Sequence, residues 1–254
     1  MNAYLERFRA DGRVAVVTGA SSGLGVGFTH CLGAVGASVV VAARRGDRLQ
    51  ELCEQLASEG VPAHHVVMDV TDPAGCKELV AAAVSRFGAL DILINNAGVG
   101  GSVPSHKEAP DHFRKVVDVN LMGTYWMAQA AVEVMQPGAV IVNVASLHAV
   151  TASRFPQAAY TASKAGVLGL TRDLASQWSQ RRGIRVNALC PGYVETEMTS
   201  AGIEPLSAMV EAGSIMGRLG RQDEMDSALL FLATDASSYM TGAALMVDGG
   251  YSVV

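Results

Sequence analysis

Short apolar segments recur along the chain, and turn residues follow each of them. Most of these segments are apolar at nearly every position and do not alternate between apolar and polar side chains. An unbroken apolar run of this length is typical of a strand that is covered on both faces, as in a parallel sheet. We therefore predict seven strands, at Val14–Val17, Ser38–Ala42, His65–Met68, Ile92–Ile94, Val140–Val144, Arg185–Leu189 and Ala244–Val247.

Longer segments with helical spacing of their apolar residues lie between these strands. One ends near Gly36, and the others are Arg48–Ala57, Ala74–Phe87, Asp111–Met135, Gln157–Gln180 and Asp223–Ala233. Strands and helices that alternate in this way predict a doubly wound α/β fold, with helices on both faces of a seven-stranded parallel sheet. Because no repeat or linker interrupts the pattern, residues 1–254 are expected to form a single domain.

The segment Glu197–Leu219 is the least regular part of the pattern, with four glycine or proline residues among scattered apolar ones. Two interpretations stand side by side, a mobile lid at 197–219 over a substrate pocket and an ordinary surface connection. Its methionines, Met198 among them, would give a pocket an adaptable lining, although core packing explains a methionine equally well.

Composition and charge narrow the class of protein. Half of the 254 residues are hydrophobic, 17% are charged and the formal net charge is −5, as in a compact globular chain. No block of like charges stands out, so neither nucleic acid nor an anionic membrane is expected as a partner. The four cysteines lack metal-ligand spacing, and no metal site is expected. Without a signal-peptide core or a membrane-spanning run, we expect a cytoplasmic protein.

The turn after the first strand is rich in glycine, with G-x-x-x-G-x-G spacing from Gly19 to Gly25. Glycines here let the backbone approach a pyrophosphate, which the N–H groups at the start of the following helix can bind. The spacing alone is weak, because a chain with 27 glycines produces it by chance, and a structural turn is the alternative. Its position favours a dinucleotide site formed by Gly19, Ser21, Ser22, Gly23, Leu24 and Gly25.

The end of the second strand indicates which dinucleotide binds. An acidic residue there would bind the ribose hydroxyls of NAD(H), whereas an arginine accommodates the 2′-phosphate of NADP(H). The sequence reads Ala42-Ala43-Arg44-Arg45 and contains no acid. We therefore favour NADP(H), with Arg44 as the phosphate contact, and keep NAD(H) as the alternative. In that case both arginines are solvated residues that open a helix.

Candidates for acid–base chemistry follow the fifth strand. Tyr160 and Lys164 are four residues apart in a helical segment and share a face. A nearby ammonium group lowers the pKa of a phenol, which is otherwise too high for acid–base work at neutral pH. Ser146 stands just past Val140–Val144, at the sheet edge where open α/β folds bind ligands. Each residue alone also fits a structural role, as a surface pair or a turn serine.

These residues together resemble the single-domain form of the short-chain dehydrogenase/reductase family, from about Arg13 to Gly250. The shared features are Thr18–Gly25, Asp69, Asn95 to Gly98, Asn120, Ser146, Tyr160 with Lys164, Pro191-Gly192 with Thr196, and Asp248 to Gly250. The resemblance implies a Rossmann-type three-layer sandwich and a homo-oligomer, a tetramer or else a dimer. It also implies an NAD(P)(H)-dependent oxidoreductase that interconverts a ketone or aldehyde and a secondary alcohol.

The resemblance further implies a role for each matching residue. Asn120 would hold a water molecule in a proton relay, and Ser146 would bind the substrate oxygen. Tyr160 would be the acid/base and a cofactor contact, while Lys164 would bind the nicotinamide ribose and lower the pKa of the tyrosine. The other cofactor contacts would be Asp69, Val70, Asn96, Ala97, Gly98, Pro191, Gly192, Val194 and Thr196. For Asp69 and Asn95 a purely structural role at a strand end is the alternative.

The substrate remains open at this stage. Fourteen positions separate Ser146 from Tyr160, one more than we expect for most family members, and the extra residue falls in the loop His148–Pro156. His148 either faces the substrate, together with Ser146 and Met198, or is a loop histidine near solvent. A small ketone, secondary alcohol or polyol is favoured over a 3-oxoacyl group on an acyl carrier protein. Such an acidic partner needs a basic patch, and only Arg181 and Arg182 would supply part of one.

An alternative from a different class is a protein that binds nicotinamide nucleotide without turning it over. The presence of Asn120, Ser146, Tyr160 and Lys164 argues against this alternative, because such a protein has no physical need for the set.

Overall fold

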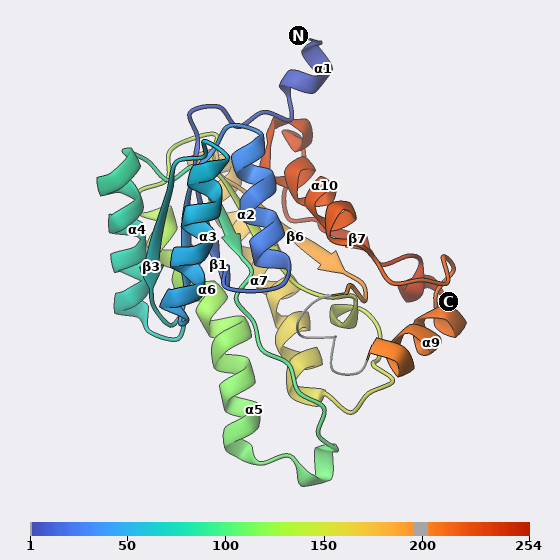
Figure 1. The fold of residues 1–254 in the computed structure, drawn as a ribbon. Helices are drawn as coiled ribbons and strands as arrows, with labels where there is room; N and C mark the ends of the chain where they lie inside the picture. Colours follow the sequence, from blue (N-terminus) through green and yellow to red (C-terminus); the bar gives the residue numbers. More distant parts are fainter. Residues whose placement is uncertain (1, 196–202) are drawn as a thin grey trace.

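The computed structural model describes residues 2–195 and 203–254. Within them, seven parallel strands form one sheet with the order β3-β2-β1-β4-β5-β6-β7 (Figure 1). The strands are β1 Val14–Thr18, β2 Ser38–Ala43, β3 Ala63–Val67, β4 Ile92–Asn95, β5 Val140–Val144, β6 Arg185–Pro191 and β7 Ala244–Val247. The order reverses between β1 and β4, which confirms the predicted doubly wound α/β fold.

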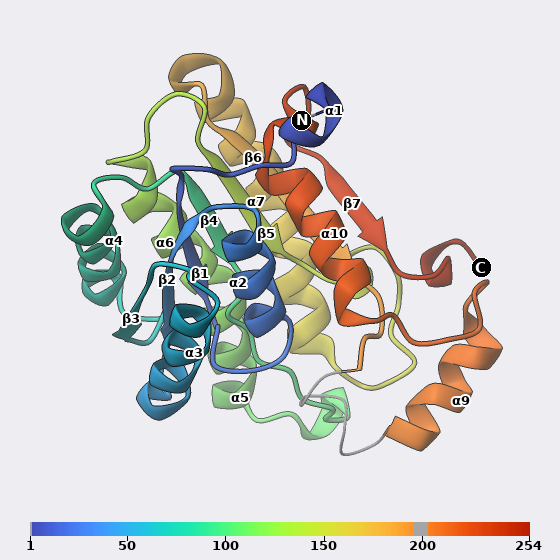
Figure 2. The ribbon, with the colours of Figure 1, turned by 45° about the horizontal axis from the view of Figure 1, so that its top comes forward.

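Helices cover both faces of the sheet, as Figure 2 shows. On one face lie α2 Leu24–Ala34, α3 Gly46–Ser58 and α10 Gln222–Ala233, and on the other lie α4 Pro73–Phe87, α6 Gly123–Val132 and α7 Ala158–Arg182. Val17 and Ile94 pack under the first layer, whereas Val16 and Leu93 pack under the second. All four are fully buried, since successive strand side chains point to opposite faces.

The largest shift between a predicted and an observed strand occurs at β3. It begins at Ala63, two residues earlier than predicted, and pairs with β2 through Val39 opposite Ala63 and Val40 opposite His64. As β3 has a neighbour on one side only, His64 and His65 remain partly exposed there. A polar start is tolerated at such an edge, so hydropathy did not reveal where the strand begins.

The segment predicted as one helix at Asp111–Met135 is interrupted in the structure. It consists of α5 Pro110–Val117, a π-helical turn at Asp118–Met122, and α6. The prediction of an unbroken helix was therefore wrong, because apolar spacing does not resolve a single extra residue in one turn. Single π-helical turns often occur at functional sites, and this one contains Asn120.

Half of the segment predicted to be irregular is also helical. The helix α9 spans Ile203–Gly213, with Leu206 and Val210 buried. Pro205 lies in its first turn, where a missing N–H group has no cost. Among the described residues, no helix is both long and apolar enough to cross a membrane.

Candidate active site

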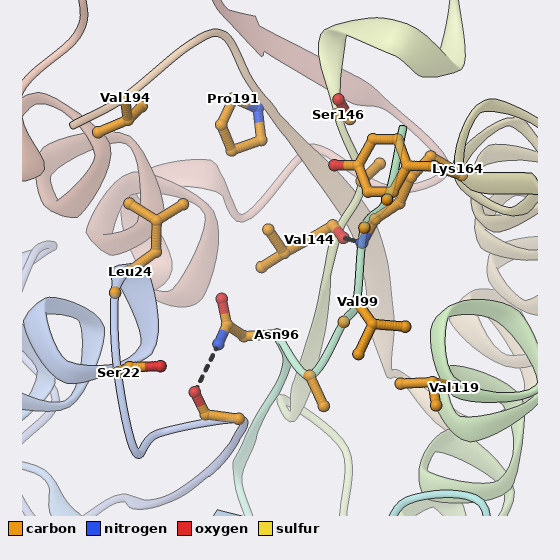
Figure 3. A pocket seen from close by; sticks show the side chains of 18 of the residues that line it. Ser22, Leu24, Asn96, Val99, Val119, Val144, Ser146, Lys164, Pro191 and Val194 are labelled. Atoms are coloured by element: carbon orange, nitrogen blue, oxygen red, sulfur yellow. Dashed lines mark hydrogen bonds between the residues drawn. The ribbon is translucent and has the colours of Figure 1, made fainter. Parts of the chain in front are cut away.

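A cavity of about 940 Å³ lies along the carboxyl ends of the central strands. The residues that follow β1, β2, β3, β4, β5 and β6 line it, together with side chains from α7 and α9. Figure 3 shows Ser22 and Leu24 at one end, Ser146 and Lys164 at the other, and Asn96 between them. The strand order reverses at this point, where doubly wound folds bind their ligands.

The glycine-rich turn forms the first end of the cavity. Gly19 has a φ of +67°, and a Cβ atom there would lie 2.7 Å from the Cα of Ala97. A Cβ atom on Gly25 would lie 2.5 Å from the carbonyl oxygen of Gly19. Glycine is therefore required at both positions. The helix α2 begins behind Gly23 without a side-chain cap, and Ser21 to Leu24 line the cavity, so its first N–H groups are available to an anion.

Asn96 braces this turn from the end of β4. Its Nδ2 donates to the carbonyl oxygens of Thr18 and Gly19, both at 3.1 Å, while its backbone N–H donates to Thr18 Oγ1 at 3.1 Å. Its neighbour Asn95 points away from the cavity, where Nδ2 donates to Asn143 Oδ1 at 2.9 Å. The structure thus places Asn96, Ala97 and Gly98 in the lining and gives Asn95 a structural role.

The two arginines after β2 behave differently. Arg44 is exposed, and its Nη1 lies 3.8 Å from Asp69 Oδ2. Both predicted residues line the cavity, as does Val70. Arg45 reaches across to the glycine-rich turn, where its Nη2 donates to Ser22 Oγ at 2.6 Å and to Ser21 Oγ at 3.1 Å. The sequence analysis gave Arg45 no role of its own, although its place beside Arg44 was a signal.

Ser146, Tyr160 and Lys164 meet at the second end of the cavity, as predicted. Ser146 follows β5 and is 6% exposed, while Tyr160 and Lys164 stand in the first two turns of α7. Lys164 is 5% exposed, and its Nζ donates to the carbonyl oxygen of Val144 at 2.7 Å (Figure 3). Burial lowers the pKa of Lys164 to about 8.

The pKa of Tyr160 departs from the expected direction. Burial raises it above its usual value, and only a hydrogen bond with Ser146 acts to lower it. The Nζ of Lys164 lies 5.8 Å from the centroid of the tyrosine ring and is directed at Val144 instead. Burial and Ser146 set this direction, and the lowering of this pKa by Lys164 with an oxidised nicotinamide bound stays a prediction.

Asn120 is fully buried beside the cavity, not in its lining. Its Oδ1 accepts from the Val99 N–H at 2.8 Å, and its Nδ2 donates to the Val99 carbonyl at 2.9 Å and to Ser163 Oγ at 3.0 Å. A Cβ atom on Gly98 would meet Asn120 Oδ1 at 3.3 Å and Lys164 Nζ at 3.4 Å, so these two groups flank the same glycine. The hydrogen bonds of Asn120 with Val99 hold the segment that follows β4 in place.

Residues after β6 complete the lining. Pro191, Gly192 and Val194 line the cavity as predicted, whereas Thr196 and Met198 lie outside the described residues. His148 is 3% exposed, and its Nε2 lies 2.9 Å from the hydroxyl oxygen of Tyr193, which also lines the cavity. The alternative of a loop histidine near solvent was therefore wrong. Tyr193 was missed, because nothing in the sequence links it to His148.

No group of three or more histidine, cysteine, aspartate or glutamate side chains in the described part of the chain could hold a metal ion.

Comparison with known proteins agrees with this arrangement. The family described as Enoyl-(Acyl carrier protein) reductase matches residues 19–252. A galactitol 2-dehydrogenase of Rhizobium johnstonii is 39% identical and a 3-oxoacyl-[acyl-carrier-protein] reductase of Thermotoga maritima is 36% identical. These alignments cover 98% of both chains in the first case, and 95% of this chain and 98% of the relative in the second.

A solved structure shares the fold over nearly the whole chain. It is a gluconate 5-dehydrogenase of Burkholderia cenocepacia in complex with NADP and tartrate, with a TM-score of 0.91 and 34% sequence identity. The match covers 98% of this chain and 99% of that one. The chain therefore belongs to the short-chain dehydrogenase/reductase family of NAD(P)-dependent oxidoreductases.

Proposed function

We propose that the protein is an NADP(H)-dependent oxidoreductase that interconverts a small ketone and a secondary alcohol. One observation carries the proposal. Ser146, Tyr160 and Lys164 meet at one end of a single cavity, and the glycine-rich turn with two arginines forms its other end. A dinucleotide that lies along the cavity would reach from the arginines to the tyrosine.

The side chains at the reaction end would have two roles, which are to bind the substrate oxygen and to transfer a proton. Ser146 and Tyr160 would both donate hydrogen bonds to the carbonyl oxygen of a ketone and so hold it at the tyrosine hydroxyl. The bound nicotinamide supplies the hydride that reaches the carbonyl carbon. As the carbonyl oxygen becomes an alkoxide, Tyr160 donates its proton to that oxygen, and in alcohol oxidation it accepts the proton instead.

Tyr160 needs a positive neighbour to act as a base, because the protein alone raises its pKa. Lys164 lies close enough to contribute, and the positive ring of an oxidised nicotinamide would add to it. The Asn120 side chain, which flanks Gly98 together with Lys164, would hold the lysine side of this arrangement in place. A proton relay through a water molecule held by Asn120 would run on the side of the cavity where Lys164 lies.

The preference for NADP(H) rests on the arginines. The end of β2 has no acidic side chain to bind ribose hydroxyls, and Arg44 is exposed at the mouth of the cavity. Arg45 adds a second guanidinium next to Ser21 and Ser22, so a 2′-phosphate between the two arginines would be bound from two sides. NAD(H) is the alternative cofactor.

The experiment for this proposal is a titration of the purified protein with NADPH and with NADH, followed by nicotinamide fluorescence, and then a turnover assay. We expect NADPH to bind at least tenfold more tightly and to be oxidised when a small ketone is added. Equal or tighter binding of NADH would overturn the assignment of the arginines. A protein that binds either cofactor but turns over no ketone or secondary alcohol would be the non-catalytic alternative.

A 3-oxoacyl group on an acyl carrier protein is the second candidate substrate, because the Thermotoga maritima relative bears that name. The geometry counts against it. Arg181 and Arg182 lie at the far end of α7, roughly 30 Å from Tyr160 at a rise of 1.5 Å per residue. They therefore cannot form a basic patch beside the pocket of the same chain, and we place a free small molecule first.

Three broader expectations belong to the same proposal. Leu206 of α9 lines the cavity, which supports a lid role for the described part of the segment, residues 203–219, whereas residues 197–202 lie outside the described residues. We also propose a homo-oligomer, a tetramer or a dimer, and a cytoplasmic location. Light scattering on the protein as it elutes from a size-exclusion column measures its mass and so distinguishes a tetramer from a dimer.

A further inference from the structure

A polar pair, of which His148 is buried and Tyr193 is half-buried, stands next to the reaction end of the cavity. His148 and Tyr193 both line the cavity, and they are joined by a hydrogen bond of 2.9 Å between the imidazole Nε2 and the tyrosine hydroxyl. The proton-transfer chemistry proposed above uses neither side chain. Placing two polar side chains in this wall has a desolvation cost that an apolar wall would avoid, so the pair calls for a functional account.

The pair is held rigidly from both sides. His148 lies in the short 3-10 turn Leu147–Ala149, and its backbone N–H donates to Ser146 Oγ at 3.2 Å. Tyr193 packs edge-on against the His148 ring at a centroid distance of 5.5 Å, and against the Tyr251 ring at 5.4 Å. The imidazole is thus fixed relative to the serine that would bind the reacting oxygen, and the phenol is fixed relative to the imidazole.

The direction of the hydrogen bond follows from the surroundings of the imidazole. Burial lowers the pKa of His148, so the ring is neutral and carries one N–H group. Its Nδ1 has no hydrogen-bond partner among the described residues, whereas the Thr151 backbone acts to raise the pKa of the ring. In the tautomer that carries the N–H on Nδ1, Nε2 is the acceptor and the Tyr193 hydroxyl donates to it.

A hydroxyl that donates its only proton still has lone pairs to offer. Ser153 also interacts with the Tyr193 hydroxyl, and the oxygen of Tyr193, which lines the cavity, can still accept a hydrogen bond from a group that carries a proton. A substrate hydroxyl meets this requirement. A carboxylate has no proton at neutral pH, and a methyl group offers the Tyr193 oxygen no hydrogen bond.

We propose that His148 and Tyr193 bind a second hydroxyl group of the substrate, next to the carbon that reacts, so that hydroxyketones and polyols are the preferred substrate class. The inference rests on the proposed function, since Ser146 must hold the reacting oxygen for the neighbouring hydroxyl to reach Tyr193. Galactitol, the polyol in the name of the Rhizobium johnstonii relative, belongs to this class.

The test compares three probes that differ at one group: 3-hydroxybutan-2-one, butan-2-one and 2-oxobutanoate, each with NADPH. We expect the hydroxyketone to have the highest kcat/KM, about tenfold above butan-2-one, which corresponds to one buried hydrogen bond. Tyr193→Phe keeps the ring and removes the oxygen. It should bring this ratio close to one, because the hydroxyketone loses a hydrogen bond that butan-2-one does not make.

Two further variants control for general damage to the aromatic cluster. Tyr251→Phe removes the hydroxyl of the ring that packs against Tyr193, and this hydroxyl has no hydrogen-bond partner among the described residues. The variant should keep the preference for the hydroxyketone. His148→Leu removes the acceptor that orients the tyrosine, and should reduce the preference as Tyr193→Phe does. Thermal unfolding and the dissociation constant of NADPH are measured for each variant, to confirm that the fold and the cofactor site are unchanged.

The outcomes separate the two proposals. If butan-2-one and 3-hydroxybutan-2-one are reduced equally well, or if Tyr193→Phe keeps the preference, the second-hydroxyl site is wrong while the proposed function stands. If 2-oxobutanoate is the best substrate, the wall binds a carboxylate and the inference is overturned. If none of the three ketones is reduced by protein that binds NADPH, the proposed function itself fails.

Discussion

The nucleotide end of the cavity is formed largely by the backbone, whereas the reaction end is formed by side chains. At the nucleotide end the backbone does most of the work, with glycines that exclude any Cβ atom and with exposed side chains such as Arg44. At the reaction end the work is done by side chains, and Ser146, His148 and Lys164 are 6%, 3% and 5% exposed. The difference suggests a test of whether binding and proton transfer are separable, because burial shifts the pKa values of His148, Tyr160 and Lys164 at the reaction end.

The strongest test of this separation is the removal of the tyrosine hydroxyl. Tyr160→Phe should lower kcat by about 10³-fold, the usual contribution of a positioned acid or base. The dissociation constant of NADPH should change by less than about twofold, because the ring of the residue stays in place and the other predicted cofactor contacts are unchanged. Stopped-flow turnover and a fluorescence titration measure the two quantities. Full turnover in the variant would remove Tyr160 from the mechanism.

A substitution at the nucleotide end should have the opposite effect, weakening cofactor binding and leaving kcat largely unchanged. Gly19→Ala should weaken NADPH binding by about 10- to 100-fold, because the new Cβ would lie 2.7 Å from the Cα of Ala97 and the turn must move. Gly12→Ala is the matched control, since Gly12 also has a positive φ, at +72°, but no atom within 4 Å of the added Cβ. At saturating NADPH the Gly19→Ala variant should keep most of its kcat. A selective loss of kcat would contradict the division between the two ends.

A smaller effect is expected from the arginines. Arg44→Ala should raise the dissociation constant of NADPH about tenfold and leave that of NADH unchanged, as expected for one charge-assisted contact with a phosphate. Arg45→Ala should act in the same direction and also free Ser21 and Ser22. Arg114→Ala, an exposed arginine on α5, serves as the control. If only Arg45→Ala alters the preference, the phosphate contact moves from Arg44 to Arg45.

The smallest effect concerns stability and its dependence on pH. Burial lowers the pKa of Lys164 from 10.5 to about 8, so the folded protein binds fewer protons than the unfolded chain between these values, and its stability rises with pH there. Below pH 8 the cost of the buried charge is present in full. Lys164→Met removes that cost, so its stability relative to the unmodified protein should be greatest near pH 7.5.

Urea unfolding at several pH values measures this difference. The advantage of Lys164→Met should shrink by about 1 kcal/mol between pH 7.5 and 9.0, as the lysine of the unmodified protein loses its proton. Arg172→Met, at an exposed position of the same helix, should show no such change. A constant difference across this range would mean that Lys164 keeps its charge.

Much of the fold could be predicted from local patterns. Fully buried strands such as β5, Val140–Val144, coincide with their apolar runs, because parallel strands at the centre of a sheet have no polar face. The start of the edge strand β3 and the π-helical turn at Asn120 did not follow from the sequence. At an edge the pattern is polar, and one extra residue in a helical turn leaves no mark on apolar spacing.

The candidate site divides in the same way. Tyr160 and Lys164 are near neighbours in sequence, and helix geometry alone brings them together. His148 and Tyr193 are 45 residues apart, on loops after different strands, and Arg45 meets Ser22 across 23 residues. Contacts of this kind depend on how strands are ordered in the sheet, which no local pattern records.

The sequence by itself determined the strands, the turn that only glycine can form, and the tyrosine–lysine pair, because each depends on residues close together in the chain. The tertiary structure decided which polar groups are buried together and therefore which pKa values shift. It raised that of Tyr160, lowered that of Lys164, and placed a neutral His148 beside Tyr193. The physical reason is that desolvation and pairing depend on distance in space, whereas helix and strand periodicity depends on distance along the chain.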